Sequence, residues 1–105
     1  MKYRVYYAER ASADAVAAYE WIKQYSEAAA NRWLSGLRNA TNSLDQFPQR
    51  CGLAPESEHF KQEIRHLLYA RYRILFRVVE NRVEIIHIRH GARAVLGSEM
   101  SDADE

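Results

Sequence analysis

The chain has 105 residues, of which 48% are hydrophobic and 28% charged, with four glycines, two prolines and a formal net charge of +1. This composition is typical of one folded domain and excludes disordered, collagen-like and multidomain architectures. No apolar run reaches the roughly 18 residues of a membrane span, and Cys51 has no second thiol for a disulfide or a zinc site. We therefore expect a cytoplasmic protein with no membrane contact, no metal and no cofactor.

The small net charge hides an uneven distribution of charges along the chain. Residues 61–93 carry eight Lys or Arg and three Asp or Glu, whereas residues 94–105 carry four acidic residues and no basic ones. Seven of those eight cations are arginines, whose guanidinium groups bind phosphate or carboxylate with paired hydrogen bonds. The basic block favours nucleic acid or an acidic protein segment as a partner, although strand arginines also serve to keep a sheet face solvated.

The first half of the chain predicts a strand followed by two helices. Aromatic and β-branched residues alternate over 2–8, as in a strand. An apolar stripe over 12–25 predicts a helix with Ser12 as its N-cap. A second stripe over 29–47, with apolar residues three and four apart, predicts a helix that ends before Pro48. The short connection between the helices predicts a helical hairpin packed on a sheet.

The second half predicts a loop and three strands. Residues 48–60 show no periodicity and contain both prolines, so we expect a loop of a length that often carries function. Apolar runs over 63–69, 72–79 and 83–90 have the length of strands, and their connections are short enough for hairpins. Asn81 is the residue expected to take a positive φ in the second hairpin turn.

These elements define an α+β fold class. The predicted order is an N-terminal strand, a helical hairpin and a three-stranded antiparallel meander. One domain covers residues 1–93, and residues 94–105 form an acidic tail that we expect to be flexible.

Strand alternation separates the charged and apolar side chains of the last two strands. Arg73 and Arg77 share one side of their strand, and the residues on the other side must face the core; these are Tyr72, Ile74, Phe76 and Val78. His87 and His90 fall on opposite sides of the last strand unless it bulges or ends between them. A histidine on which arginines converge is a candidate for proton transfer.

The residue pattern gives little support to a phosphate-binding loop, a serine or cysteine nucleophile, or a metal site. The chain contains no glycine-rich phosphate loop and no serine in a nucleophile elbow. Cys51 with His59 or His66 could form a thiol nucleophile, but a lone cysteine beside a loop proline is usually inert. The four histidines lack the carboxylate spacing of a metal site. Tyr6 could stack on nucleic-acid bases only if its side chain faces outward.

Five short runs follow the two amphipathic helices in a characteristic order: Phe47-Pro48-Gln49-Arg50, Ala54-Pro55-Glu56, Glu63-Ile64-Arg65, Tyr72-Arg73-Ile74-Leu75-Phe76 and Ile88-Arg89-His90-Gly91-Ala92-Arg93. In this order and spacing, the chain resembles the RelE/ParE superfamily of toxins from bacterial type II toxin–antitoxin modules over residues 3–93. The resemblance implies growth inhibition and neutralisation by a cognate antitoxin, through which the toxin would oligomerise. The antitoxin would place an amphipathic helix on the hairpin or the sheet. We expect an apolar groove beside the hairpin, edged by Arg65, Arg73 and Arg93.

The resemblance implies one of two targets. ParE-like members, of the plasmid-stabilisation type, bind and arrest DNA gyrase without hydrolytic chemistry. The ending His90-Gly91-Ala92-Arg93 and the strand that begins Tyr72-Arg73 are closer to this branch, which we favour. RelE-like members are mRNA interferases that cleave messenger RNA on the ribosome. An inactive binding protein with the toxin fold is a third alternative.

For a ribonuclease, the resemblance implies specific roles for five residues. Glu56 or His90 would be the acid or base, and a phosphate clamp would consist of Arg65, Arg73 and Arg93. The order Glu56, Arg73, His90 is similar to that of the YoeB-type nucleases. Two departures count against this branch: the basic cluster of the RelE-type loop is reduced to Lys61, and its catalytic tyrosine has no counterpart after Arg89.

Overall fold

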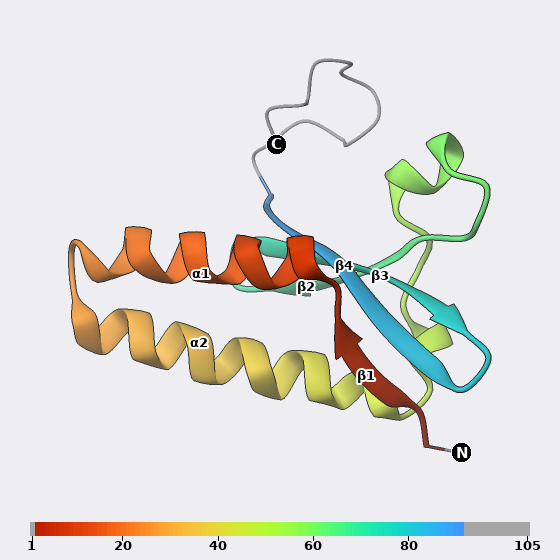
Figure 1. Cartoon of the computed structure of the whole chain (residues 1–105), viewed down its shortest axis with the longest axis horizontal. Helices are drawn as coiled ribbons and strands as arrows, with labels where there is room; N and C mark the ends of the chain where they lie inside the picture. The colour runs from red at the N-terminus through yellow and green to blue at the C-terminus, as the bar shows by residue number, and fades with distance from the viewer. Residues whose placement is uncertain (1, 92–105) are drawn as a thin grey trace.

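The computed structural model describes residues 2–91, so Arg93 and the expected acidic tail lie outside the described residues. Its elements follow the predicted α+β order (Figure 1): β1 (Arg4–Tyr7), α1 (Glu9–Lys23), α2 (Glu27–Asn42), β2 (Arg65–Tyr69), β3 (Tyr72–Val79) and β4 (Arg82–His90). The segment expected to be a loop contains two short 3₁₀ helices, η2 (Pro48–Arg50) and η3 (Pro55–His59), and a third, η1 (Ser43–Asp45), extends α2. Neither described α-helix is long and apolar enough to cross a membrane.

The four strands form one sheet in the order β1-β4-β3-β2. Strands β2, β3 and β4 pair antiparallel, which confirms the predicted meander. Strand β1 pairs parallel with β4, with Val5 opposite Val83. A parallel partner at this edge is possible because the helical hairpin carries the chain back before the meander begins.

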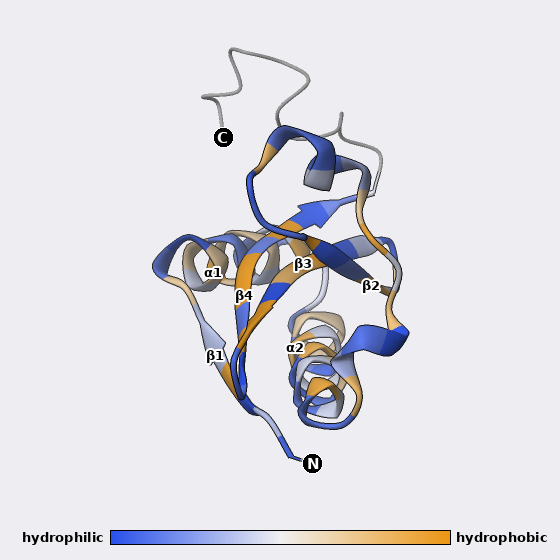
Figure 2. Cartoon of the chain, turned by 90° about the vertical axis from the view of Figure 1, so that its right-hand side faces the viewer, coloured by the Kyte–Doolittle hydropathy of each residue, from blue (hydrophilic) through white to orange (hydrophobic). Residues whose placement is uncertain are grey.

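The helices pack on one face of the sheet, and the apolar residues of the two central strands face them. As predicted, Ile74 and Phe76 are fully buried against the hairpin, while Tyr72 and Val78 are partly buried beside them. Strands β3 and β4 carry long apolar stretches (Figure 2). Leu75 points to the opposite face and belongs to a second, smaller cluster with two residues of the segment before β2, Ala54 and Ile64. That segment therefore packs on the sheet through an apolar cluster of its own.

Both helices differ from their predicted bounds, 12–25 and 29–47, at both ends. Ser12 is not a cap: α1 begins after Ala8, whose N–H still donates to Ile85 O at 2.8 Å. The helix therefore starts where the backbone pairing of β1 ends. Helix α2 is capped by Ser26, whose Oγ accepts a hydrogen bond from the N–H of Ala29 at 3.0 Å. It ends at Asn42 because the chain tightens there into a 3₁₀ turn.

The hairpin turns take positive φ at an unexpected position. The φ angles of Ala70 and Glu80 are 54° and 58°, and Asn81 is not among the residues with positive φ. The prediction for Asn81 is therefore wrong. Each positive φ falls on the first of two residues between the paired strand ends, which is the position that a II′ turn requires.

Candidate functional site

The sheet face opposite the helices carries a buried ion pair. Glu56 of η3 is fully buried, and Arg73 of β3 donates Nη1–H to its Oε1 at 3.0 Å. The second guanidinium nitrogen, Nη2, donates to the other carboxylate oxygen, so the contact is bidentate. A carboxylate buried away from water needs an opposing charge, and Arg73 supplies one to Glu56.

His66 of β2 is the third member of this cluster. Its Nδ1 lies 3.4 Å from Nη1 of Arg73. Burial lowers the pKa of His66 and the adjacent Arg73 charge lowers it further, against the opposing effect of Glu56. A neutral imidazole can accept a proton. His66 is not among the residues that the family resemblance implies for a ribonuclease site. The pairing of β2 with β3 places it near Arg73, because Leu68, on the same face of β2, lies opposite Arg73.

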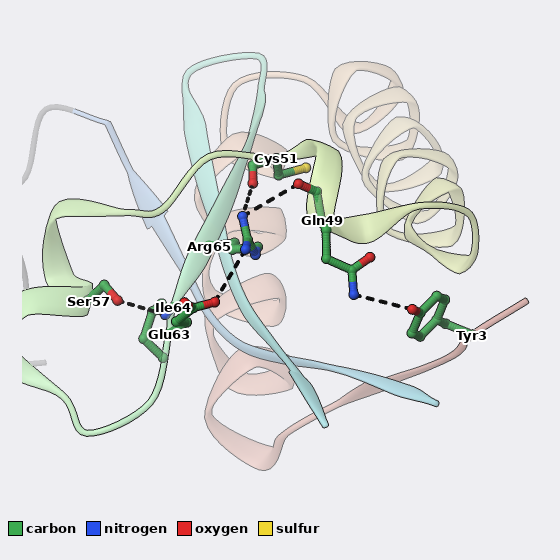
Figure 3. Close-up of polar contacts among 7 residues, drawn as sticks. All are labelled: Tyr3, Gln49, Cys51, Ser57, Glu63, Ile64 and Arg65. Atoms are coloured by element: carbon green, nitrogen blue, oxygen red, sulfur yellow. Dashed lines mark hydrogen bonds and ion pairs between the residues drawn. The ribbon is translucent and has the colours of Figure 1, made fainter. Parts of the chain in front are cut away.

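Arg65 lies on the other face of the sheet, since its partner across the ladder is the core residue Phe76. Figure 3 shows its guanidinium reaching the segment before β2. Nη1 donates to the carbonyls of Cys51 at 2.6 Å and Gln49 at 3.5 Å, and Nη2 donates to Glu63 at 3.3 Å. Arg65 therefore holds backbone in place, and the structure does not bring it to Arg73.

His90 is also separated from Arg73 by the sheet. Its ring packs edge-on against Tyr72, with ring centroids 5.2 Å apart, and it lines a hollow of about 470 Å³ with Asp14 and Trp21 of α1. Tyr72 and His90 are ladder partners, as are Arg73 and Arg89. Since neighbours along a strand point to opposite faces, Glu56 and Arg73 lie together but His90 does not join them.

A β-bulge places His87 and His90 on the same side of the sheet, where α1 packs. The register between β3 and β4 shifts at Leu75, which pairs with His87, while Phe76 pairs with Ile85. His87 lies on the side of Val83 and Ile85 and reaches Asp14, with 2.6 Å between Nδ1 and Oδ2. The extra residue in β4 brings Ile88 and His90 to this side as well. This is the bulge without which His87 and His90 would lie on opposite sides.

Asp14 is held ionised by these contacts. Burial raises its pKa, but hydrogen bonds from His87, from the N–H of Ile88 at 2.9 Å and from Arg10, together with the charge of His87, bring the pKa below its usual value. The carboxylate of Asp14 thus joins α1 to the end of β4.

Cys51 lacks the properties of a nucleophile. It is buried, and desolvation raises the pKa of its thiol against the opposing charges of Arg50 and Arg65. The protonated thiol is a poor nucleophile. Over residues 2–91, no three His, Cys, Asp or Glu side chains gather in a way that could hold a metal ion.

An apolar groove of about 380 Å³ runs beside the helical hairpin, as expected. Its lining includes Tyr7, Ala15, Val16, Tyr19, Leu34 and Leu37, and the charged residues Glu20 and Arg38. Neither Arg65 nor Arg73 lines it, because the first is tied to residues 49–51 and the second is on the far face of the sheet. The expectation that these two arginines edge the groove is therefore wrong, and Arg93 is outside the described residues.

Comparison with known proteins identifies the family. Residues 5–95 match the family described as the ParE toxin of the type II toxin–antitoxin system parDE. The chain belongs to this ParE toxin family. The RelE/ParE resemblance noted in the sequence is thereby confirmed.

This ParE-family chain is similar to two known proteins, one in sequence and one in fold. It is 36% identical over 85 residues to the toxin RelE2 of Caulobacter vibrioides, which covers 80% of this chain and 90% of that protein. Its fold is similar to a chain of the chromosomal ParDE toxin–antitoxin system from P. aeruginosa, with a TM-score of 0.68 and 20% identity, covering 85% of this chain and 96% of that chain. One of these proteins is named for the RelE branch of the superfamily and the other for the ParE branch.

Proposed function

We propose that this ParE-family toxin arrests growth in the cytoplasm by binding DNA gyrase, with no hydrolytic chemistry of its own. The observation that carries the proposal is that the residues a ribonuclease would need bind other groups of the protein itself. Both carboxylate oxygens of Glu56 accept hydrogen bonds from Arg73, and Glu56 is fully buried. A base must reach the proton that it removes, and a clamp must reach its phosphate.

The other ribonuclease candidates are placed apart from this pair. Arg65 is committed to the carbonyls of Cys51 and Gln49, and His90 packs on Tyr72 on the helix side of the sheet. Four of the residues that the resemblance implies for a ribonuclease site thus lie on two faces of the sheet. This arrangement supports a toxin that acts by binding, and the match to the ParE family description points in the same direction.

Ribosome-dependent cleavage of messenger RNA is the second candidate function. It is favoured by the relative named RelE2 and by the cluster of His66 with Arg73. In that case the neutral imidazole of His66 would accept the proton of the 2′-hydroxyl, and Arg73 would have to exchange Glu56 for the phosphate.

We also propose that a cognate antitoxin occupies the groove between α1 and α2 and that the toxin oligomerises through it. The groove is apolar with one acidic and one basic residue in its lining, which suits an amphipathic helix. Val16 is 60% exposed there although it is aliphatic. Co-purification with the cognate antitoxin tests the proposal: Val16→Asp should abolish it, and Arg32→Gln at an exposed position of α2 should not.

Two assays on one preparation separate the two targets. The first follows gyrase supercoiling of a relaxed plasmid, and the second maps a defined message by primer extension after cell-free translation. We expect blocked supercoiling and an intact message. New 5′ ends that require ribosomes and disappear with His66→Gln would overturn the gyrase proposal. Ends that persist with both His66→Gln and His90→Gln would indicate a contaminating nuclease, and no effect in either assay would contradict both candidates.

A further inference from the structure

The sheet face opposite the helices exposes an aromatic ring at its β1 edge. Along β1, Val5 and Tyr7 pack against the core, whereas Arg4 and Tyr6 point to the opposite face. Tyr6 is 44% exposed. Its side chain therefore meets the condition for a stacking surface, namely that the ring faces outward.

Two arginines beside this ring have no counter-ion among residues 2–91. Arg4 of β1 is the direct ladder partner of Arg82 of β4, and both are exposed. Like charges opposite each other on neighbouring strands repel and destabilise a sheet. Within residues 2–91 neither guanidinium is paired with a carboxylate. A charge arrangement that costs stability and has no carboxylate partner in the described part of the chain is suited to an external anion.

The acidic group beside Tyr6 is already neutralised. A hollow of about 360 Å³ is lined by Tyr6 and Arg82 and also by Arg77, Val79 and Glu84. The Oε1 of Glu84 accepts from Nε of Arg77 at 2.7 Å and lies 2.6 Å from its Nη2. The remaining nitrogen of Arg77, Nη1, donates to Gln62 at 2.7 Å. The cations left for a ligand are therefore Arg4 and Arg82.

We propose that Arg4, Tyr6 and Arg82, here called the β1 patch, bind single-stranded nucleic acid. One base stacks on the Tyr6 ring, and the flanking phosphates contact the two guanidinium groups. An acidic peptide could satisfy the arginines but would make no use of the ring. The patch is at the opposite end of β4 from Arg89, the ladder partner of Arg73, so it is separate from the Glu56–Arg73 cluster. The inference does not depend on whether the toxin acts on gyrase or on the ribosome.

Fluorescence anisotropy with labelled oligo-dT and oligo-U decamers tests the patch. The wild-type chain should bind at least one decamer at low salt, and comparison of the two shows whether the 2′-hydroxyl matters. Tyr6→Leu should weaken binding at least fivefold, the factor that corresponds to a loss of about 1 kcal/mol for one stacked base, whereas Tyr6→Phe keeps the ring and should bind like wild type. Arg4→Gln with Arg82→Gln should reduce the slope of log K against log salt by about 1.4, or about 0.7 for each phosphate that is no longer neutralised.

Arg32→Gln is the matched control, because Arg32 is an exposed arginine on α2, away from the patch. It should leave binding within twofold of wild type. Circular dichroism of each variant verifies the fold. The proposal is overturned if neither decamer binds, if Arg32→Gln weakens binding as much as the patch variants do, or if Tyr6→Leu has no effect. A poly-glutamate peptide that displaces the decamers from wild type and Tyr6→Leu equally would instead assign the arginines to an acidic protein partner.

Discussion

Arg73 of β3 donates two hydrogen bonds to the carboxylate of Glu56, which precedes it by 17 residues and is fully buried in η3. The pair ties the irregular segment between α2 and β2 to the sheet face that the helices leave uncovered. Two of the five residues that the family resemblance suggested for RNA cleavage therefore join this segment to the sheet.

Removal of the Glu56 charge should lower the stability of the folded protein. Glu56→Gln leaves the guanidinium of Arg73, whose side chain is 12% exposed, without its counter-ion, and we expect a loss of about 3 kcal/mol in the free energy of unfolding. Urea denaturation measures it. Glu63→Gln is the control, because the Glu63 carboxylate is 70% exposed and its ion pair is screened by water.

A double variant separates the pair from the individual residues. Replacement of both charges, by Glu56→Leu and Arg73→Leu together, leaves no buried ion and should be more stable than Glu56→Gln alone. If Glu56→Gln is as stable as wild type, the carboxylate has no structural role and its candidacy as a catalytic base is strengthened.

The elements of the fold could be predicted from the sequence because their signals are local. Helix α2 follows from its apolar stripe, and the core side of β3 follows from strand alternation. The burial of Glu56 could not be predicted in this way. A carboxylate after a proline in an aperiodic segment is typical of a solvated loop, and its burial depends on the packing of Ala54 and Ile64 against Leu75.

The candidate site could be predicted only in part, because its geometry depends on contacts between strands. The family resemblance placed Glu56 and Arg73 in one set, and the structure does bring them together. The side on which His90 lies depends on the bulge opposite Leu75, which is a property of the pairing of two strands and not of either alone. His66 enters the cluster through the same kind of pairing, so alternation within its own strand did not identify it.

His66 should make stability depend on pH near neutrality. Its pKa is lowered from 6.5, first by burial and then by the Arg73 charge, so the unfolded chain takes up this proton at a higher pH than the folded chain does. Stability should therefore fall as the pH drops from about 7.5 to about 5.5. Urea denaturation across this range should show a flatter profile for His66→Gln, whereas the exposed His59→Gln should keep the slope. An NMR titration midpoint for His66 at or above 6.5 would contradict the expectation.

Asp14 should contribute stability that acid removes. Burial raises its pKa, but the contacts with His87 and the N–H of Ile88 bring it below 3.8. The contribution is complete above the pKa of the unfolded chain and is lost as the pH falls through the lower pKa of the folded chain. The difference in unfolding free energy between wild type and Asp14→Asn should thus be larger at about pH 5 than at about pH 2.5.

Asp45→Asn is a suitable comparison for Asp14, since Asp45 pairs with the exposed Lys2 at 3.7 Å instead of a buried histidine. It should show a much smaller difference between the two pH values, because surface ion pairs contribute little. An Asp14→Asn difference that stays constant with pH would show that the residue acts through its shape and not through its charge.

Gly36 should resist a substitution that normally stabilises a helix. Gly to Ala inside a helix usually gains up to about 1 kcal/mol, but a Cβ at position 36 would lie 2.1 Å from Oη of Tyr69 and 2.9 Å from its Cζ. The ring would have to move and lose its hydrogen bond to Trp33 O, which is 2.9 Å long. We expect Gly36→Ala to destabilise by about 1–3 kcal/mol, as for an overpacked core.

A double-mutant cycle assigns the cost to this contact. In a Tyr69→Leu background the hydroxyl and ring are absent, so Gly36→Ala should become neutral or stabilising, and the coupling energy should equal most of the single-variant loss. Ser35→Ala, at the exposed neighbouring position of α2, should not destabilise in either background. If Gly36→Ala is at least as stable as wild type, the close approach of β2 to α2 at Tyr69 is not a constraint on the fold. Packing against Tyr69 would then not explain the glycine at position 36.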